Sequence, residues 1–287
     1  MRRYVMAACL LSVMSVGCTP AGVEKKTEST EKDGKVETPK TSENVQMSID
    51  GDYKVGDELK MDNGIVIKWF KHGSGEKLVH ADFVLIDYKV ILKDQTIVDG
   101  NHLLNKPSIP FMVGFKMQTE GWDIALKELR VGDFAEIFIP SKLARGEKGI
   151  EGLIPPNADN ILRIRIIEKK IPTREVEGNK VWVFENNPNN KKKFGDDTEI
   201  EFHCMVSTPS NPMYVNTYRS NTPFKLRMED SGTVPGLKKA LINAKKSDRM
   251  FVYIPSSQAY GTKGYLDIVK PNEDLLYNVL VMDIHDK

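Results

Sequence analysis

Residues 111–166 read FMVGFKMQTEGWDIALKELRVGDFAEIFIPSKLARGEKGIEGLIPPNADNILRIRI, and this stretch predicts one helix followed by two strands. Apolar side chains recur at the helical spacing i, i+3, i+4 and i+7, namely Trp122, Ala125, Leu126 and Leu129. The segments DFAEIFIP and ILRIRII are rich in β-branched and aromatic residues, as strands are. A single helix beside several strands is typical of an α+β domain.

The loop between the two strands carries an adjacent pair of prolines. Pro155 and Pro156 fix φ, donate no backbone hydrogen bond and bias the preceding residue toward extended geometry. Leu153 and Ile154 stand directly before the pair, so we expect a rigid loop that holds both apolar side chains in place. The loop alone leaves open whether they line a binding site or fill a core.

The same pattern returns 115 residues later. ARGEKG (144–149) matches AYGTKG (259–264), and GLIPPNADNIL (152–162) matches DIVKPNEDLLY (267–277). The helical spacing also recurs, at Leu237, Ala240, Leu241 and Ala244, and Pro235 suits the first helical turn. Because solenoid repeats are much shorter than this period, the repeat predicts two domains of α+β class, each an antiparallel sheet over one short helix.

The first residues resemble an export signal. MRRYVMAACLLSVMSVGC has a basic start and an apolar run too short to span a bilayer. Ser15 to Cys18 resembles a bacterial lipobox, although Ser15 stands where leucine is usual, so we expect residues 1–17 to be a lipoprotein signal peptide and Cys18 to be acylated. An ordinary cleaved signal is the alternative.

Residues 18–50 have few large apolar side chains and many Lys, Glu, Thr and Ser residues. Such a segment cannot bury enough apolar surface to offset the entropy of ordering, so we expect a disordered tether, with a partner site as the alternative. The folded domains are then expected at 51–171 and 172–287.

The composition argues against several classes of site. With Cys9 in the signal and Cys18 acylated, Cys204 is the one thiol left, so no internal disulfide or cysteine metal site forms. The five histidines show no ligand spacing, and we expect neither a metal nor a cofactor. A formal net charge of +1 gives no indication of nucleic-acid binding.

The stretch 111–166 resembles the FKBP-type peptidyl-prolyl isomerases, through its G-W helix, its A-x-G-x-x-G segment and the sequence I-P-P-N-A. The resemblance extends back through Asp87-Tyr88 and Asp99 to about residue 60, and the second copy is a weaker match over about 180–287. It implies two tandem domains of the family's fold, an apolar substrate pocket and no cofactor.

The resemblance also implies the site residues. We expect a pocket with Trp122 as its floor and Thr119 where the family offers a backbone N–H to the ligand carbonyl. The catalytic set carried over from the family is Tyr88, Asp99, Thr119, Trp122 and Ile154. The substrate-binding set is Val98, Phe111, Arg145, Leu153 and Leu162.

Both copies depart from the family's pattern. Arg145 replaces the rim tyrosine of the first copy, where it either selects acidic peptides or points to water. The second copy keeps Tyr260 but has Leu237 in place of the floor tryptophan and Phe202 aligned with Tyr88. We therefore expect the second domain to keep the fold and to lack the pocket.

Together with the export signal, the resemblance implies a peptidyl-prolyl cis-trans isomerase that acts on X–Pro bonds of exported or envelope proteins through domain 51–171. The alternative is a non-catalytic peptide-binding or chaperone lipoprotein that uses the same groove, and an accessory role in an envelope complex is a third. The expected location is a bacterial envelope, with the protein lipid-anchored to a membrane, the outer one by preference, and facing periplasm or exterior. The sequence leaves the client proteins, the role of the second domain and the oligomeric state open.

Overall fold

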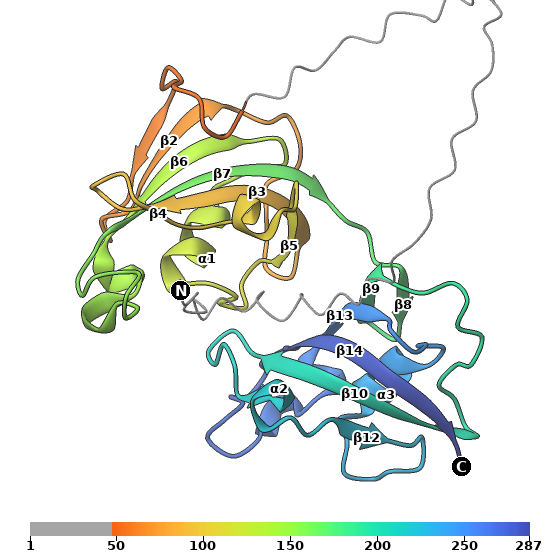
Figure 1. Ribbon diagram of the computed structural model, residues 1–287. Helices are drawn as coiled ribbons and strands as arrows, with labels where there is room; N and C mark the ends of the chain where they lie inside the picture. The colour runs from red at the N-terminus through yellow and green to blue at the C-terminus, as the bar shows by residue number, and fades with distance from the viewer. Residues whose placement is uncertain (1–47) are drawn as a thin grey trace, which may run out of the picture.

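The computed structural model describes residues 48–287, so Cys18, the predicted signal peptide and most of the predicted tether lie outside it. The described chain folds into two sheets of seven strands, each with a short helix against it (Figure 1). All strand pairs within the two sheets are antiparallel. The predicted α+β plan is confirmed.

The first sheet has the spatial order β1-β2-β6-β7-β3-β4, and β5 pairs with β3. The strands and the helix of the first domain are β1 (Glu58–Lys60), β2 (Val66–Lys71), β3 (Phe83–Ile91), β4 (Ile97–Gly100), β5 (Ile109–Met112), α1 (Glu120–Leu126), β6 (Phe134–Ile139) and β7 (Asn160–Lys169). Short 3₁₀ helices span Asn101–Leu104, Ser141–Leu143 and Gly146–Lys148. Side chains of β7 alternate between buried and half-buried, so one face of this central strand points into the core beneath α1.

The second sheet has the order β11-β10-β14-β13-β9-β8, and β12 pairs with β10. Its elements are β8 (Arg174–Val176), β9 (Asn179–Glu185), β10 (Thr198–Ser207), β11 (Val215–Asn216), α2 (Thr217–Ser220), β12 (Phe224–Leu226), α3 (Pro235–Leu241), β13 (Arg249–Ile254) and β14 (Leu275–Asp286). Two 3₁₀ helices, Ser256–Gln258 and Gly261–Lys263, repeat those of the first domain. As predicted, α3 begins at Pro235.

Strand register corrects the expected alignment of Phe202 with Tyr88. Tyr88 pairs with Ile164, whereas the equivalent residue of β14, Val279, pairs with Cys204. The residues of β10 are therefore shifted by one position relative to the constant offset of the repeat. Cys204 occupies the place of Tyr88, and Phe202 occupies the place of Ile86.

The two domains share an aromatic contact. The ring of Phe83, at the start of β3, stacks on Trp182 of β9 at 5.1 Å and packs against Phe251 of β13 at 5.3 Å. Trp182 and Phe251 belong to the same buried cluster as the core of the first domain. Beside this cluster His80 Nε2 lies 3.4 Å from Asp274 Oδ2. The chain thus passes from β7 into β8 with both domains in contact (Figure 1).

Within the described residues, no helix has both the length and the apolar character needed to cross a membrane.

Candidate functional site

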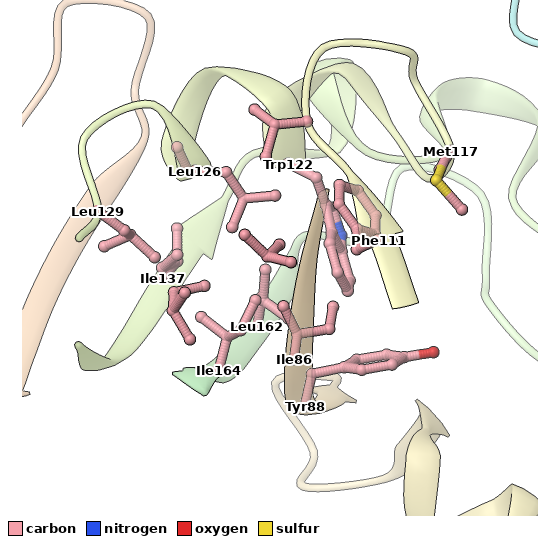
Figure 2. Close-up of a cluster of buried hydrophobic side chains, with 14 of the residues drawn as sticks. Ile86, Tyr88, Phe111, Met117, Trp122, Leu126, Leu129, Ile137, Leu162 and Ile164 are labelled. Carbon is pink, nitrogen blue, oxygen red and sulfur yellow. The ribbon is translucent and has the colours of Figure 1, made fainter. Parts of the chain in front are cut away.

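Trp122 is the largest side chain beneath the candidate site, and it is only 1% exposed. Its indole stacks on Phe111 at 5.6 Å and meets the ring of Tyr88 edge-on at 5.1 Å. Figure 2 shows Trp122 beside Phe111, with Leu162 and Ile164 nearby in the same cluster. Because aromatic rings bury large areas in fixed mutual geometry, this trio holds the indole in one orientation.

Asp123, the next residue of α1, fixes the segment that precedes the helix. Its carboxylate accepts hydrogen bonds from the backbone N–H groups of Gly114 at 2.9 Å and Lys116 at 2.6 Å. Burial raises the pKa of Asp123 above its ordinary value, although these two bonds act to lower it. The carboxylate thereby anchors the turn between β5 and α1, which carries Thr119.

The proline loop forms the opposite wall. Ile150 and Ile154 exchange two backbone hydrogen bonds of 2.8 Å, which close a tight turn around Leu153. Gly149 makes this turn possible, because its φ is +56° and a Cβ atom there would lie 2.2 Å from the Ile154 carbonyl oxygen. Ile154 is buried and Leu153 is half-buried, so the loop holds both side chains against the site.

These elements enclose a small cavity of about 20 Å³, which is little more than the space of one water molecule. It is lined by Val90, Val98, Asp99, Gln118, Thr119, Trp122, Arg145, Ile150, Leu153, Ile154 and Asn160. An open groove of about 530 Å³ runs along residues 148–156 and shares Ile150, Leu153 and Ile154 with the cavity. The groove thus offers an extended chain a surface beside the cavity.

A polar bridge connects the residues around this cavity. Arg145 Nη2 donates a hydrogen bond of 2.9 Å to Gln118 Oε1, and Gln118 Nε2 donates one of 3.4 Å to Asp99 Oδ2. The interpretation that Arg145 simply points to water is therefore wrong. A ring-sized ligand does not fit the cavity while its lining stays in place, so the lining has to move when such a ligand enters.

Two buried polar atoms of the cavity lining have no hydrogen-bond partner among residues 48–287. They are the hydroxyl of Thr119, a residue that is 7% exposed, and the side-chain oxygen of Asn160, a residue that is 3% exposed. An unsatisfied buried polar group destabilises the folded protein by about 1–3 kcal/mol. A bound peptide offers N–H and C=O groups that can remove this penalty.

The structure brings seven of the ten residues expected at the site together around the cavity: Val98, Asp99, Thr119, Trp122, Arg145, Leu153 and Ile154. Tyr88 and Phe111 lie behind them, with their rings against the indole rather than on the cavity surface. Leu162 is fully buried on β7 and belongs to the core. These three support the floor from below.

Sequence reasoning missed four residues of the lining: Val90, Gln118, Ile150 and Asn160. A signal existed for Asn160, because the alternation along β7 places it on the same inward face as Leu162 and Ile164. Gln118 offered no such signal, since its role depends on a partner 27 residues away.

The second domain has a cavity at the equivalent place, so the expectation that it lacks a pocket is wrong. This cavity has a volume of about 340 Å³ and includes Leu237, the counterpart of Trp122, in its lining. Loss of the indole enlarged the space instead of closing it.

No group of three or more metal-ligating side chains comes together in the part of the chain that the structure describes.

Comparison with protein families gives the same match for both domains. Residues 74–167 and 190–282 each match the model of the FKBP-type peptidyl-prolyl cis-trans isomerases.

Curated relatives agree over parts of the chain. The human peptidyl-prolyl cis-trans isomerase FKBP10 is 27% identical over 206 residues, which are 72% of this chain and 35% of that protein. The yeast peptidyl-prolyl cis-trans isomerase FPR2 is 33% identical over 95 residues, 33% of this chain and 70% of that protein. The outer membrane protein MIP of Legionella longbeachae is 32% identical over 108 residues, 38% of this chain and 45% of that protein. The chain thus spans about a third of FKBP10 and under half of MIP.

The polar bridge generates a prediction about Arg145. Arg145→Tyr removes the bond to Gln118 and places an aromatic hydroxyl at the rim, so it should tighten binding of an Ala-Ala-Pro-Ala peptide by about fivefold to tenfold, the worth of one net hydrogen bond. Titration calorimetry measures the affinity. Lys142→Tyr, which adds a tyrosine at a nearby exposed position, should leave the affinity for the peptide unchanged. Weaker binding by Arg145→Tyr, above all for peptides with Asp or Glu before proline, would show instead that the arginine selects acidic ligands.

Proposed function

Because the chain belongs to the FKBP-type peptidyl-prolyl cis-trans isomerase family, we propose that its first domain isomerises X–Pro peptide bonds of unfolded or partly folded polypeptides. The observation that carries the proposal is the cavity that has Trp122 as its floor and Ile154 in its wall. Both residues belong to the sequence motifs of the family. Exported or envelope proteins are the proposed clients.

The reaction needs no nucleophile. Rotation about an X–Pro bond meets a barrier of about 18–20 kcal/mol because resonance keeps the amide planar. A twisted amide has lost this resonance and is less dipolar, so an apolar, water-poor cavity stabilises it relative to the planar ground state. Each tenfold gain in rate requires about 1.4 kcal/mol of such differential stabilisation.

Several residues of this chain contribute to the binding of the substrate and to the stabilisation of the twisted amide. The indole of Trp122 supplies the apolar floor for the proline ring, and Ile154 and Val98 supply apolar walls. The segment at Thr119, held by Asp123, positions the substrate backbone at the start of α1. Entry of the ring displaces the Arg145–Gln118 bridge, which therefore tunes affinity rather than chemistry.

A non-catalytic peptide-binding function is the second candidate, and one observation favours it. The rim position that carries tyrosine in the family carries Arg145, which is engaged with Gln118. A site closed in this way can bind peptides along the groove at 148–156 without admitting the proline ring.

Substitution of the floor separates the two candidates. Trp122→Leu, which copies Leu237, should lower kcat/KM for prolyl isomerisation by about tenfold or more, because the ring loses the indole face while the position stays apolar. Exchange NMR on a proline-containing peptide measures the rate without a coupled protease.

Trp69→Leu is the matched control in the same domain. Trp69 is also buried, but it lies on β2 and does not line the cavity. Its indole N–H donates a hydrogen bond to Asp133. This variant should lose stability and keep its activity once folded. No detectable isomerisation by the unsubstituted chain would reject the enzyme and leave the peptide-binding candidate.

For location, we propose a bacterial envelope protein anchored by a lipid on Cys18. The lipobox-like sequence before Cys18 supports this, and so does the similarity of the chain to the Legionella outer membrane protein MIP.

Metabolic labelling with a fatty acid tests the anchor. Cys18→Ser should abolish the label and release the protein from the membrane fraction, because serine lacks the sulfur atom through which the lipid would be attached. The buried Cys204, changed to Ser, is the control and should leave the label unchanged. Equal labelling of Cys18→Ser and the unsubstituted chain contradicts the anchor.

A further inference from the structure

The cavity of the second domain is larger than that of the first by more than tenfold, at about 340 Å³ against about 20 Å³. It lies between α3, β10, β12 and β14. Its lining includes Leu237 and the aromatic side chains of Phe202, Tyr214, Phe224, Tyr260 and Tyr277. Pockets for small molecules have volumes of about 300–1,000 Å³, so this cavity can hold a bulky group without rearrangement.

Two replacements explain the extra volume. Leu237 is smaller than the indole of Trp122 and leaves the floor deeper. The polar bridge is also absent, because Val215 takes the place of Asp99 and Tyr260 that of Arg145. Val215 pairs with Val206 as Asp99 pairs with Val90, which fixes the equivalence.

Three tyrosines give the cavity neutral hydrogen-bonding groups. Burial raises the pKa values of Tyr214, Tyr260 and Tyr277. Their hydroxyls therefore stay protonated at neutral pH. Lys225, an exposed residue, is the one charged side chain among the described residues of the lining.

Exposed apolar side chains surround the mouth. Phe224 is 43% exposed and Tyr265 is 44% exposed, and both contribute to the cavity wall. Leu266, next to Tyr265, is 76% exposed. Apolar side chains that gather in this way beside a cavity are typical of an interaction site.

We propose that the second domain binds one bulky apolar side chain, aromatic or leucine-sized, of an extended polypeptide client. The aromatic and aliphatic walls of the cavity accept the side chain. The hydroxyl of Tyr260, half-buried near the mouth, hydrogen-bonds a backbone carbonyl of the client. This site holds the client without isomerising it, and it does not depend on the activity of the first domain.

A polypeptide is the occupant that these features favour. The neutral hydroxyls suit the carbonyl groups of a peptide backbone, and the scarcity of charge disfavours ionic ligands, which lose hydration on entry. The depth left by Leu237 suits a side chain larger than a proline ring. The equivalent cavity of the first domain, floored by Trp122, is the site proposed above for the X–Pro bond.

Peptides of the form acetyl-Gly-Gly-X-Gly-Gly-amide, titrated into the ¹⁵N-labelled full chain, test the proposal. Peptides with X as Phe or Leu should shift the amide signals around residues 236–241, 260–266 and 276–278, whereas those with X as Ala or Lys should not. Leu237→Trp fills the cavity and should abolish the shifts. Tyr260→Phe should weaken binding by about fivefold to tenfold through loss of one hydrogen bond.

Controls separate binding from folding. Met282→Trp adds the same side chain at an exposed position of β14 and should bind like the unsubstituted chain. Signal dispersion reports whether each variant is folded, and Tyr260→Phe, which removes a single hydroxyl, tests the site if Leu237→Trp fails to fold.

Three results would overturn the proposal: shifts that survive in folded Leu237→Trp, equal shifts with X as Ala, or no shift in the second domain at millimolar peptide. Shifts that depend on protein concentration alone, and that Leu237→Trp removes, would assign the cavity to a second copy of the chain instead. Isomerase activity measured on the same samples depends on Trp122, so failure here and failure of the proposed isomerase are distinguishable.

Discussion

The packing of one side chain beneath each cavity controls what each domain can hold. In the first domain the indole of Trp122 is held between Phe111 and Tyr88 and fills the space under α1. In the second domain Leu237 occupies the equivalent turn of α3, and the surrounding core has not collapsed onto it. Folded cores are close-packed and relax only partly when a large side chain is lost, so the difference persists as volume. The same fold therefore carries a tight cavity in the first domain and a wide cavity in the second.

The two domains that carry these cavities pack against each other through aromatic side chains. Phe83, Trp182 and Phe251 join the sheets through stacked rings, and Trp182 also donates its indole N–H to the Lys170 carbonyl in the connecting segment. Asp274 adds a polar contact: although burial acts to raise its pKa, hydrogen bonds from His80, the Ser256 N–H and Tyr253 hold that pKa below its ordinary value. A carboxyl with a lowered pKa stabilises the folded state above about pH 4 and loses that contribution as the pH falls further.

Much of the fold and part of the site follow from local sequence. The spacing of Trp122, Ala125 and Leu126 predicts α1, and the proline pair predicts the rigid loop that presents Ile154, because both depend on neighbours along the chain. The bridge from Arg145 to Gln118 and the position of Tyr88 behind the indole depend on distant residues, so no local pattern indicates them. The alignment of Phe202 with Tyr88 is wrong by two residues, because strand pairing places Cys204 opposite Val279 as Tyr88 lies opposite Ile164, and no local pattern fixes this register. The cavity of the second domain is not predicted from the sequence, because the replaced site residues do not show how the core packs around the smaller Leu237.

The asymmetry of the two cavities is the central claim, and xenon binding in crystals of the protein tests it most directly. Xenon under pressure occupies apolar cavities that are large enough to admit it. The account predicts xenon density between Leu237 and Tyr277 in the second domain and none above Trp122 in the first. Density above Trp122 together with an empty second cavity, or equal occupancy of both, would contradict the account.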